Sequence, residues 1–78
     1  MLTEQHIYER ITAFLPGASC VVCDTTGTGD HFRVEVESAA FAGKSIVDQH
    51  RLVYAAVQAE LDDGSLHALS IATQSRVD

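Results

Sequence analysis

Histidine and cysteine are the side chains of this sequence with the widest chemical range. The chain contains four histidines and two cysteines. Neutral imidazole and thiolate are common ligands of iron and zinc, and both groups can also act in proton transfer or redox chemistry. These residues are His6, His31, His50 and His67, with Cys20 and Cys23. Which of them can act together depends on the elements that carry them.

The two cysteines have the Cys-x-x-Cys spacing of redox and zinc motifs. A redox motif of this kind lies at a helix N-terminus, which lowers the pKa of its first thiol, whereas Cys20 and Cys23 fall in the apolar, β-prone segment 18–24. Residues three apart on a strand face opposite sides of the sheet, and a structural zinc site would need a second ligand pair. We therefore interpret both cysteines as small apolar core residues.

Length, composition and charge limit the classes of function. The 78 residues fit one domain, 1–78, and 46% hydrophobic with 21% charged residues is typical of a globular protein. Five basic against eleven acidic residues give a net charge of −6, which disfavours binding to phosphate groups. No apolar run approaches the ~20 residues of a membrane span. The first residues lack the basic start of a signal peptide, and two cysteines without such a signal predict free thiols in a reducing cytoplasm.

Hydrophobic periodicity and turn residues predict the order helix, strand, strand, helical turn, helix, strand. The loop between the first two strands contains two glycines and no apolar residue, so we expect it to be flexible. The predicted ranges are helix 4–15, strand 18–24, loop 25–30, strand 31–37, helical turn 38–43, helix 46–61, strand 66–73 and a frayed tail 74–78.

This order places two of the histidines together. The first two strands are expected to form a hairpin, but the route from the second to the third passes through helices, and such a crossover normally makes a parallel pair. Parallel neighbours start at the same end of a sheet. His31 begins the second strand and His67 lies near the start of the third, so both are predicted at one end, although strict alternation points His31 away from Phe32 and so away from His67.

The long predicted helix carries further polar residues. Its apolar stripe consists of Ile46, Val47, His50, Val53, Tyr54, Val57 and Leu61. His50 lies on that stripe, so we interpret it as a buried core histidine. Arg51 projects to the side and Lys44 precedes the helix. Each either contacts a partner protein or covers solvated surface.

Three blocks of the sequence resemble the BolA family. They are FAGKSIVDQHRLVY at 41–54, LHALSI at 66–71 and GDHF at 29–32, and the last is similar to the loop ending of the histidine-bearing members. The resemblance implies an α+β fold similar to class II KH domains, with the order α-β-β-α-α-β and a three-stranded mixed sheet.

The same resemblance implies a non-catalytic partner of a monothiol glutaredoxin with glutathione, acting in iron–sulfur cluster handling and iron homeostasis. In such complexes a [2Fe–2S] cluster is shared between the two proteins. The BolA-like side would supply His67 and a loop residue, here His31, with Cys23 as the alternative. Two histidines cannot hold a cluster alone, so the remaining ligands must come from the partner. Alone, the chain is expected to be a monomer or a weak homodimer.

A KH-like nucleic-acid-binding transcriptional regulator is the alternative function. A KH domain grips nucleic acid with a G-x-x-G loop, and no two of the five glycines are three residues apart. The acidic net charge also weighs against this function. The sequence contains no Walker loop, no G-x-S-x-G elbow and no dinucleotide fingerprint, so we predict no enzymatic activity.

Overall fold

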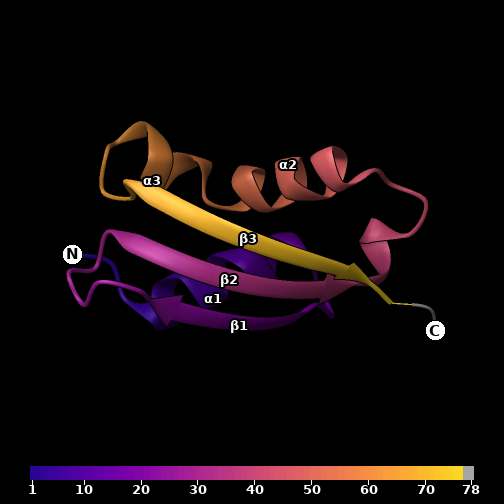
Figure 1. Cartoon of the computed structure of the whole chain (residues 1–78), viewed down its shortest axis with the longest axis horizontal. Helices are drawn as coiled ribbons and strands as arrows, with labels where there is room; N and C mark the ends of the chain where they lie inside the picture. Colours follow the sequence, from indigo (N-terminus) through magenta and orange to yellow (C-terminus); the bar gives the residue numbers. More distant parts are fainter. Residues whose placement is uncertain (77–78) are drawn as a thin grey trace.

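The computed structural model describes residues 1–76 and contains one three-stranded sheet packed against helices (Figure 1). The element order confirms the predicted α+β architecture. The elements are α1 (Glu4–Phe14), β1 (Ser19–Asp24), β2 (His31–Ser38), a 3-10 turn η1 (Ala39–Phe41), α2 (Ile46–Ala56), α3 (Gln58–Asp62) and β3 (Ala68–Ser75). No helix within residues 1–76 is long and apolar enough to cross a membrane.

The sheet has the order β1-β2-β3, with β2 in the centre. β1 pairs with β2 in antiparallel fashion, as expected for a hairpin, and Val21 lies opposite Glu35. β2 and β3 are parallel, with His31 opposite Ala68. The predicted crossover is therefore confirmed, and it brings the starts of β2 and β3 to the same end of the sheet.

One face of the sheet is covered by the helices. On β2, buried Phe32, Val34 and Val36 alternate with exposed Arg33 and Glu35. This alternation is typical of a strand with one face in the core and one in solvent. The core cluster combines these residues with the apolar stripe of α1 and with parts of α2 and the segments around it: Ile7, Ile11, Leu15, Phe41, Val53, Ala56, Val57 and Leu66.

The predicted helix 46–61 is two helices. Val57 has a non-helical backbone (φ −117°, ψ 22°) that ends α2 and starts α3. The predicted stripe is also rotated, because Ile46 and Val47 are each 60% exposed while Gln49 is buried. Gln49 is tolerated in the core because its side chain donates to the Lys44 carbonyl and accepts from the Thr73 hydroxyl.

His50 is half-buried and lies outside the core cluster, so its interpretation as a buried core histidine is wrong. The cause is the same rotation of α2, which turns Gln49 and Val53 toward the sheet instead of Ile46 and Val47. Periodicity identified the helix, but the polar residue that faces the sheet could not be distinguished from an exposed one.

The C-terminal strand lies two residues later than predicted and includes part of the expected frayed tail. Arg76, directly after β3, donates to the Glu37 carboxylate at 3.0 Å and to the Gly17 carbonyl at 2.8 Å. These contacts fasten the end of β3 to β2 and to the α1–β1 turn. Residues 77–78 of the predicted tail lie outside the described residues.

Candidate functional site

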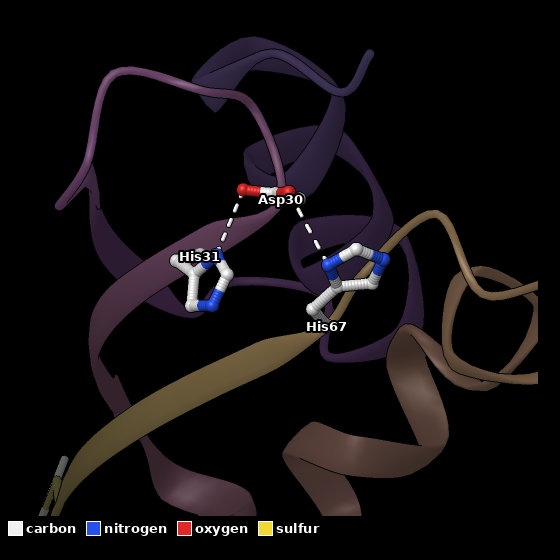
Figure 2. Close-up of side chains that lie close together, drawn as sticks. All are labelled: Asp30, His31 and His67. Atoms are coloured by element: carbon white, nitrogen blue, oxygen red, sulfur yellow. Dashed lines mark hydrogen bonds and ion pairs between the residues drawn. The ribbon is translucent and has the colours of Figure 1, made fainter.

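His31 and His67 meet at the end of the sheet where β2 and β3 begin (Figure 2). Their ring centroids are 5.8 Å apart and the rings are perpendicular. The backbone locks this junction, because the His67 N–H donates to the Asp30 carbonyl at 2.8 Å. His67 precedes the first residue of β3, so strand alternation does not govern its direction. The two histidines therefore come together although alternation placed them on opposite faces.

The Asp30 carboxylate lies between the two histidines (Figure 2). One of its oxygens contacts His31 Nδ1 at 2.7 Å, and the other contacts His67 Nδ1 at 3.2 Å. The His31 contact is a hydrogen bond. An ionised carboxylate only accepts hydrogen bonds, so His31 Nδ1 carries the proton in this arrangement. A carboxylate that receives the Nδ1–H of a histidine fixes the ring and raises its basicity as a ligand.

Hydrogen bonds from the Thr28 hydroxyl and from His31 hold the pKa of Asp30 below its ordinary value, although partial desolvation opposes them. The carboxylate is therefore ionised at neutral pH. Sequence reasoning did not select Asp30 as a site residue. Its position next to His31 was visible, but its contact with His67 depends on the register of the β2–β3 pair.

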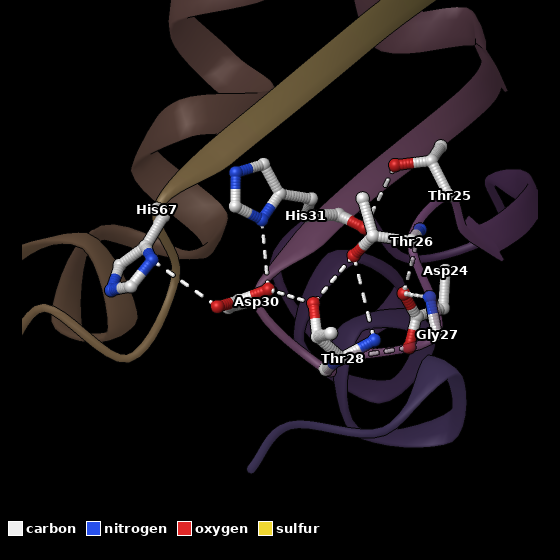
Figure 3. Close-up of polar contacts among 9 residues, drawn as sticks. Asp24, Thr25, Thr26, Gly27, Thr28, Asp30, His31 and His67 are labelled. Carbon is white, nitrogen blue, oxygen red and sulfur yellow. Dashed lines mark hydrogen bonds and ion pairs between the residues drawn. The ribbon is translucent and has the colours of Figure 1, made fainter.

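The β1–β2 loop is organised around the Asp24 carboxylate (Figure 3). This carboxylate accepts the backbone N–H groups of Thr26, Gly27 and Gly29 at 3.3, 2.9 and 3.0 Å. Asparagine and aspartate commonly stabilise turns by such bonds to their own following backbone. The structure therefore shows a loop held by internal hydrogen bonds where the sequence predicted a flexible one.

The start of the chain fastens the same loop from outside. The Glu4 carboxylate accepts the Asp24 N–H at 2.8 Å, and the Leu2 N–H donates to the Gly29 carbonyl at 3.1 Å. Gly29 has φ +74°, and a Cβ there would come within 2.8 Å of the Leu2 carbonyl oxygen. Only glycine combines this backbone conformation with so close a neighbour. The position of Asp30 thus depends on α1 as well as on the sheet.

His67 is positioned by the α3–β3 turn. The backbone carbonyl of Glu60 in α3 accepts the Leu66 N–H at 3.0 Å, and its side chain contacts His6 at 2.7 Å and Arg10 at 3.2 Å on α1. Burial would raise the pKa of Glu60, but the hydrogen bond with His6 and the positive charge of Arg10 lower it below the ordinary value. Glu60 therefore fastens α3 and the following turn to α1.

The three polar side chains at the sheet end are accessible to solvent and to other molecules. The side chains of Asp30, His31 and His67 are 28%, 42% and 59% exposed. In each histidine, Nε2 forms no hydrogen bond within the described part of the chain, and it points away from Asp30 (Figure 2). The arrangement is an open group of two imidazoles and one carboxylate that can receive a metal or a partner.

The two cysteines lie on β1 and are both free thiols. Cys20 is half-buried and packs against the core, whereas Cys23 is exposed. The prediction that they face opposite sides is thus confirmed, but the interpretation of Cys23 as a core residue is wrong. In the β1–β2 register, Cys23 lies opposite Arg33, and Arg33 is two residues after His31 on β2. Cys23 remains the alternative loop ligand.

Lys44 and Arg51 are not part of the histidine group. α2 begins at the end of the molecule opposite the start of β2 (Figure 1), and Lys44 lies just before it. Arg51 lies in α2 with 76% of its side chain exposed and contacts Asp48 at 3.4 Å. The longest dimension of the molecule is 36 Å. A partner that contacts His31 and His67 as well as Lys44 and Arg51 must therefore extend along the molecule.

Comparison with known proteins identifies the family. The sequence matches the model of the BolA-like protein family over residues 10–77. The chain belongs to the BolA-like family. Protein BOLA2 of Arabidopsis thaliana is 38% identical to this BolA-like chain over 72 residues, which cover 91% of this chain and 75% of that protein.

Solved structures support the same assignment. The crystal structure of a bol-like protein from Babesia bovis has a TM-score of 0.83 at 28% identity, with 96% of this chain and 86% of that one covered. The BolA domain of SufE1 from Arabidopsis thaliana has a TM-score of 0.80 at 37% identity, with 92% and 90% covered. The BolA-like chain corresponds to only a part of some curated relatives, such as 12% of SufE-like protein 1 of the same plant.

Proposed function

We propose that this BolA-like chain is a non-catalytic adaptor that shares a [2Fe–2S] cluster with a monothiol glutaredoxin. His67 and His31 are its ligands, and thiolates of the glutaredoxin and of glutathione complete the set. The observation that supports this most is the pair of histidine rings, 5.8 Å apart, at one exposed end of the sheet. The proposal places the protein in cluster trafficking and iron homeostasis in the cytoplasm.

The donor groups fit such a cluster. Two imidazoles can replace two thiolates on one iron of a [2Fe–2S] cluster, and this substitution raises the reduction potential. Bound to the protein, a cluster of this kind supplies electron-transfer chemistry or is passed on intact. The chain's own contribution is two neutral ligands, whose Nδ1 atoms contact the Asp30 carboxylate oxygens at 2.7 Å for His31 and 3.2 Å for His67. Because two imidazoles cannot complete the coordination, a partner must bind at the same end.

Two cationic residues of this acidic chain suit a partner with an acidic contact surface along α2. The net charge is −6, and Lys44 and Arg51 are the cationic residues proposed to contact the partner, on α2 and just before it. We place the partner mainly over the histidine end, with a secondary contact along α2. The complex then buries the exposed rings and excludes water from the shared iron.

Reconstitution tests the proposed function directly. The chain, a monothiol glutaredoxin, glutathione, iron and sulfide are combined without oxygen, and the cluster is followed by visible absorption and circular dichroism. We expect a spectrum that differs from that of the glutaredoxin alone and that reverts toward it in His67→Ala and, to a smaller degree, in His31→Ala. His50→Ala removes a half-buried histidine of α2 and serves as the matched control.

Binding of the two proteins is measured separately, by calorimetry without iron, so that a lost ligand is distinguished from a lost contact. Lys44→Glu with Arg51→Glu is expected to weaken this binding without changing the cluster spectrum of the complex that still forms. If the spectrum of the complex is the same with and without the His67 imidazole, the ligand assignment fails.

A further inference from the structure

The converging side chains at the sheet end form a second kind of site. Asp30, His31 and His67 each offer one ligand atom, and these atoms lie within 4.8 Å of one another. We propose that the three side chains bind a single divalent transition-metal ion in this chain alone, without a partner protein. The proposal concerns the histidines named above but does not depend on a shared cluster.

The geometry requires small movements only. Both Nδ1 atoms face the Asp30 carboxylate, at 2.7 and 3.2 Å from its two oxygens (Figure 2). With metal–ligand bonds of about 2.1 Å, neighbouring donors of a tetrahedral ion lie roughly 3.4 Å apart. An ion that binds both Nδ1 atoms requires each imidazole to carry its proton on Nε2 instead, where solvent accepts it, and it needs side-chain shifts of about an ångström. The backbone at the junction already holds these residues together, through the Asp30 carbonyl and the His67 N–H.

The ligand types select the class of ion. Two imidazoles with one carboxylate are suited to Fe²⁺, Zn²⁺ or Co²⁺, whereas Mg²⁺ and Ca²⁺ prefer oxygen ligands alone. The net charge of −6 favours a cation in general, and Asp30 supplies the local negative charge. Three protein ligands leave at least one coordination position open. Because the three side chains are 28–59% exposed, solvent occupies that position and the ion exchanges readily.

The same contacts would also be seen if Asp30 only oriented the rings by hydrogen bonding. The two roles differ in their response to Asp30→Asn. Asparagine keeps the size of the side chain and one acceptor oxygen, but it removes the negative charge and one oxygen ligand. A ligand role predicts a large loss of metal affinity with little change in fold. An orienting role predicts a small loss.

The experiment uses the purified chain, stripped of metal with a chelator and titrated with Co²⁺. Visible d–d absorption reports nitrogen and oxygen ligands, competition with Zn²⁺ gives relative affinity, and Mg²⁺ is the negative control. We expect one ion per chain. Asp30→Asn and His67→Ala are expected to weaken binding at least tenfold, whereas Asp48→Asn and His50→Ala, matched changes on α2, leave it within twofold.

A measurement on the unmodified chain avoids any dependence on folding of the variants. Zn²⁺ is expected to shift the ¹⁵N resonances of the His31 and His67 ring nitrogens in long-range proton–nitrogen spectra, and not those of His6 and His50. Absence of binding at millimolar Co²⁺ overturns the proposal. Full affinity in folded Asp30→Asn overturns it also, as does an intense near-ultraviolet thiolate–cobalt band that Cys23→Ser removes. None of these results involves a glutaredoxin, so the shared-cluster function succeeds or fails separately.

Discussion

At the scale of single residues, Asp30 determines what the two histidines can do. A histidine on a strand end is free to rotate, and two such rings would point in many directions. Here one carboxylate contacts Nδ1 of both His31 and His67, so the rings share a fixed partner. The histidines could be selected from the sequence, because parallel strands start at one end. Asp30 could not be selected in this way, because its contact with His67 depends on how β2 pairs with β3 in the folded chain.

The two thiols of β1 are expected to react at very different rates. Burial raises the pKa of the Cys20 thiol, which lowers its thiolate fraction at neutral pH, whereas Cys23 is exposed. A thiol-specific reagent such as a disulfide dye should therefore label one cysteine quickly in the native chain. Cys23→Ser is predicted to remove the fast phase and Cys20→Ser to leave it. Equal rates for the two single variants would contradict the placement of Cys23 at the surface.

At the scale of elements, the β1–β2 loop is the part whose structure the sequence described least well. Two glycines and several polar residues indicated a flexible connection, because composition reports what a segment lacks. The order comes from specific bonds, above all from the Asp24 carboxylate to three backbone N–H groups. These bonds require a particular turn, and turn geometry is set together with the hairpin register and with α1.

Gly29→Ala is predicted to destabilise this loop more than Gly27→Ala. Both glycines have positive φ, +74° and +76°, which costs other residues about 1–2 kcal/mol. Only at Gly29 does a Cβ also approach a backbone oxygen, that of Leu2, at 2.8 Å, whereas at Gly27 nothing lies within 4 Å. Urea unfolding of both variants measures the difference. A loss at Gly29 no larger than that at Gly27 would show that the chain start is not fixed against the loop.

The contact of α1 with α3 gives the fold a dependence on pH. The pKa of Glu60 is lower in the folded chain than its ordinary value of 4.5. A carboxylate with a lowered folded pKa adds stability that is complete above the unfolded pKa and is lost as the pH falls through the folded one. We therefore expect the free energy of unfolding to decrease from about pH 5 downward.

Glu60→Gln removes this titrating group. At pH 7 the substitution should cost about 1–2 kcal/mol, because Glu60 loses the charge that pairs with Arg10 and that strengthens its hydrogen bond with His6, while His6 and Arg10 themselves stay half exposed. Below pH 4 the variant and the parent chain should approach each other in stability. Thermal unfolding from pH 3 to pH 8 provides the comparison, and parallel curves at all pH values would exclude a role for the Glu60 charge.

At the scale of the whole molecule, the distribution of charge disfavours nucleic acid as a partner. Net charge is −6, and each of the four arginines contacts a carboxylate: Arg10 that of Glu60, Arg33 that of Glu35, Arg51 that of Asp48 and Arg76 that of Glu37. Paired arginines have less tendency to release counterions from phosphates. The KH-like arrangement of elements thus occurs here without the cationic surface of a nucleic-acid-binding domain.

Duplex DNA should accordingly not be retained by this chain. In a fluorescence anisotropy titration at 50 and 150 mM salt, we expect weak or no binding at the higher concentration. Specific binding whose affinity decreases steeply with salt would support the transcriptional-regulator alternative. A basic protein of similar size serves as the positive control for the probe.

The overall architecture was largely predictable, while the details of α2 were not. Alternation on β2 and the crossover rule fixed the sheet, since both depend on local pattern and chain handedness. The burial of Gln49 depends on hydrogen bonds with the Lys44 carbonyl and the Thr73 hydroxyl, which lie outside α2. Such contacts have no local pattern in the sequence.

The parallel pairing of β2 with β3 has a consequence for the order of folding. The β1–β2 hairpin can close early because its strands are neighbours in the chain, whereas β3 must return across two helices, and pairing of distant segments is slow. His31 is therefore in place before His67 arrives, and the donor pair forms only when the last strand docks. Under the proposed function, a partly synthesised or partly folded chain would offer only one of the two histidine ligands, so binding of the cluster would require the complete fold.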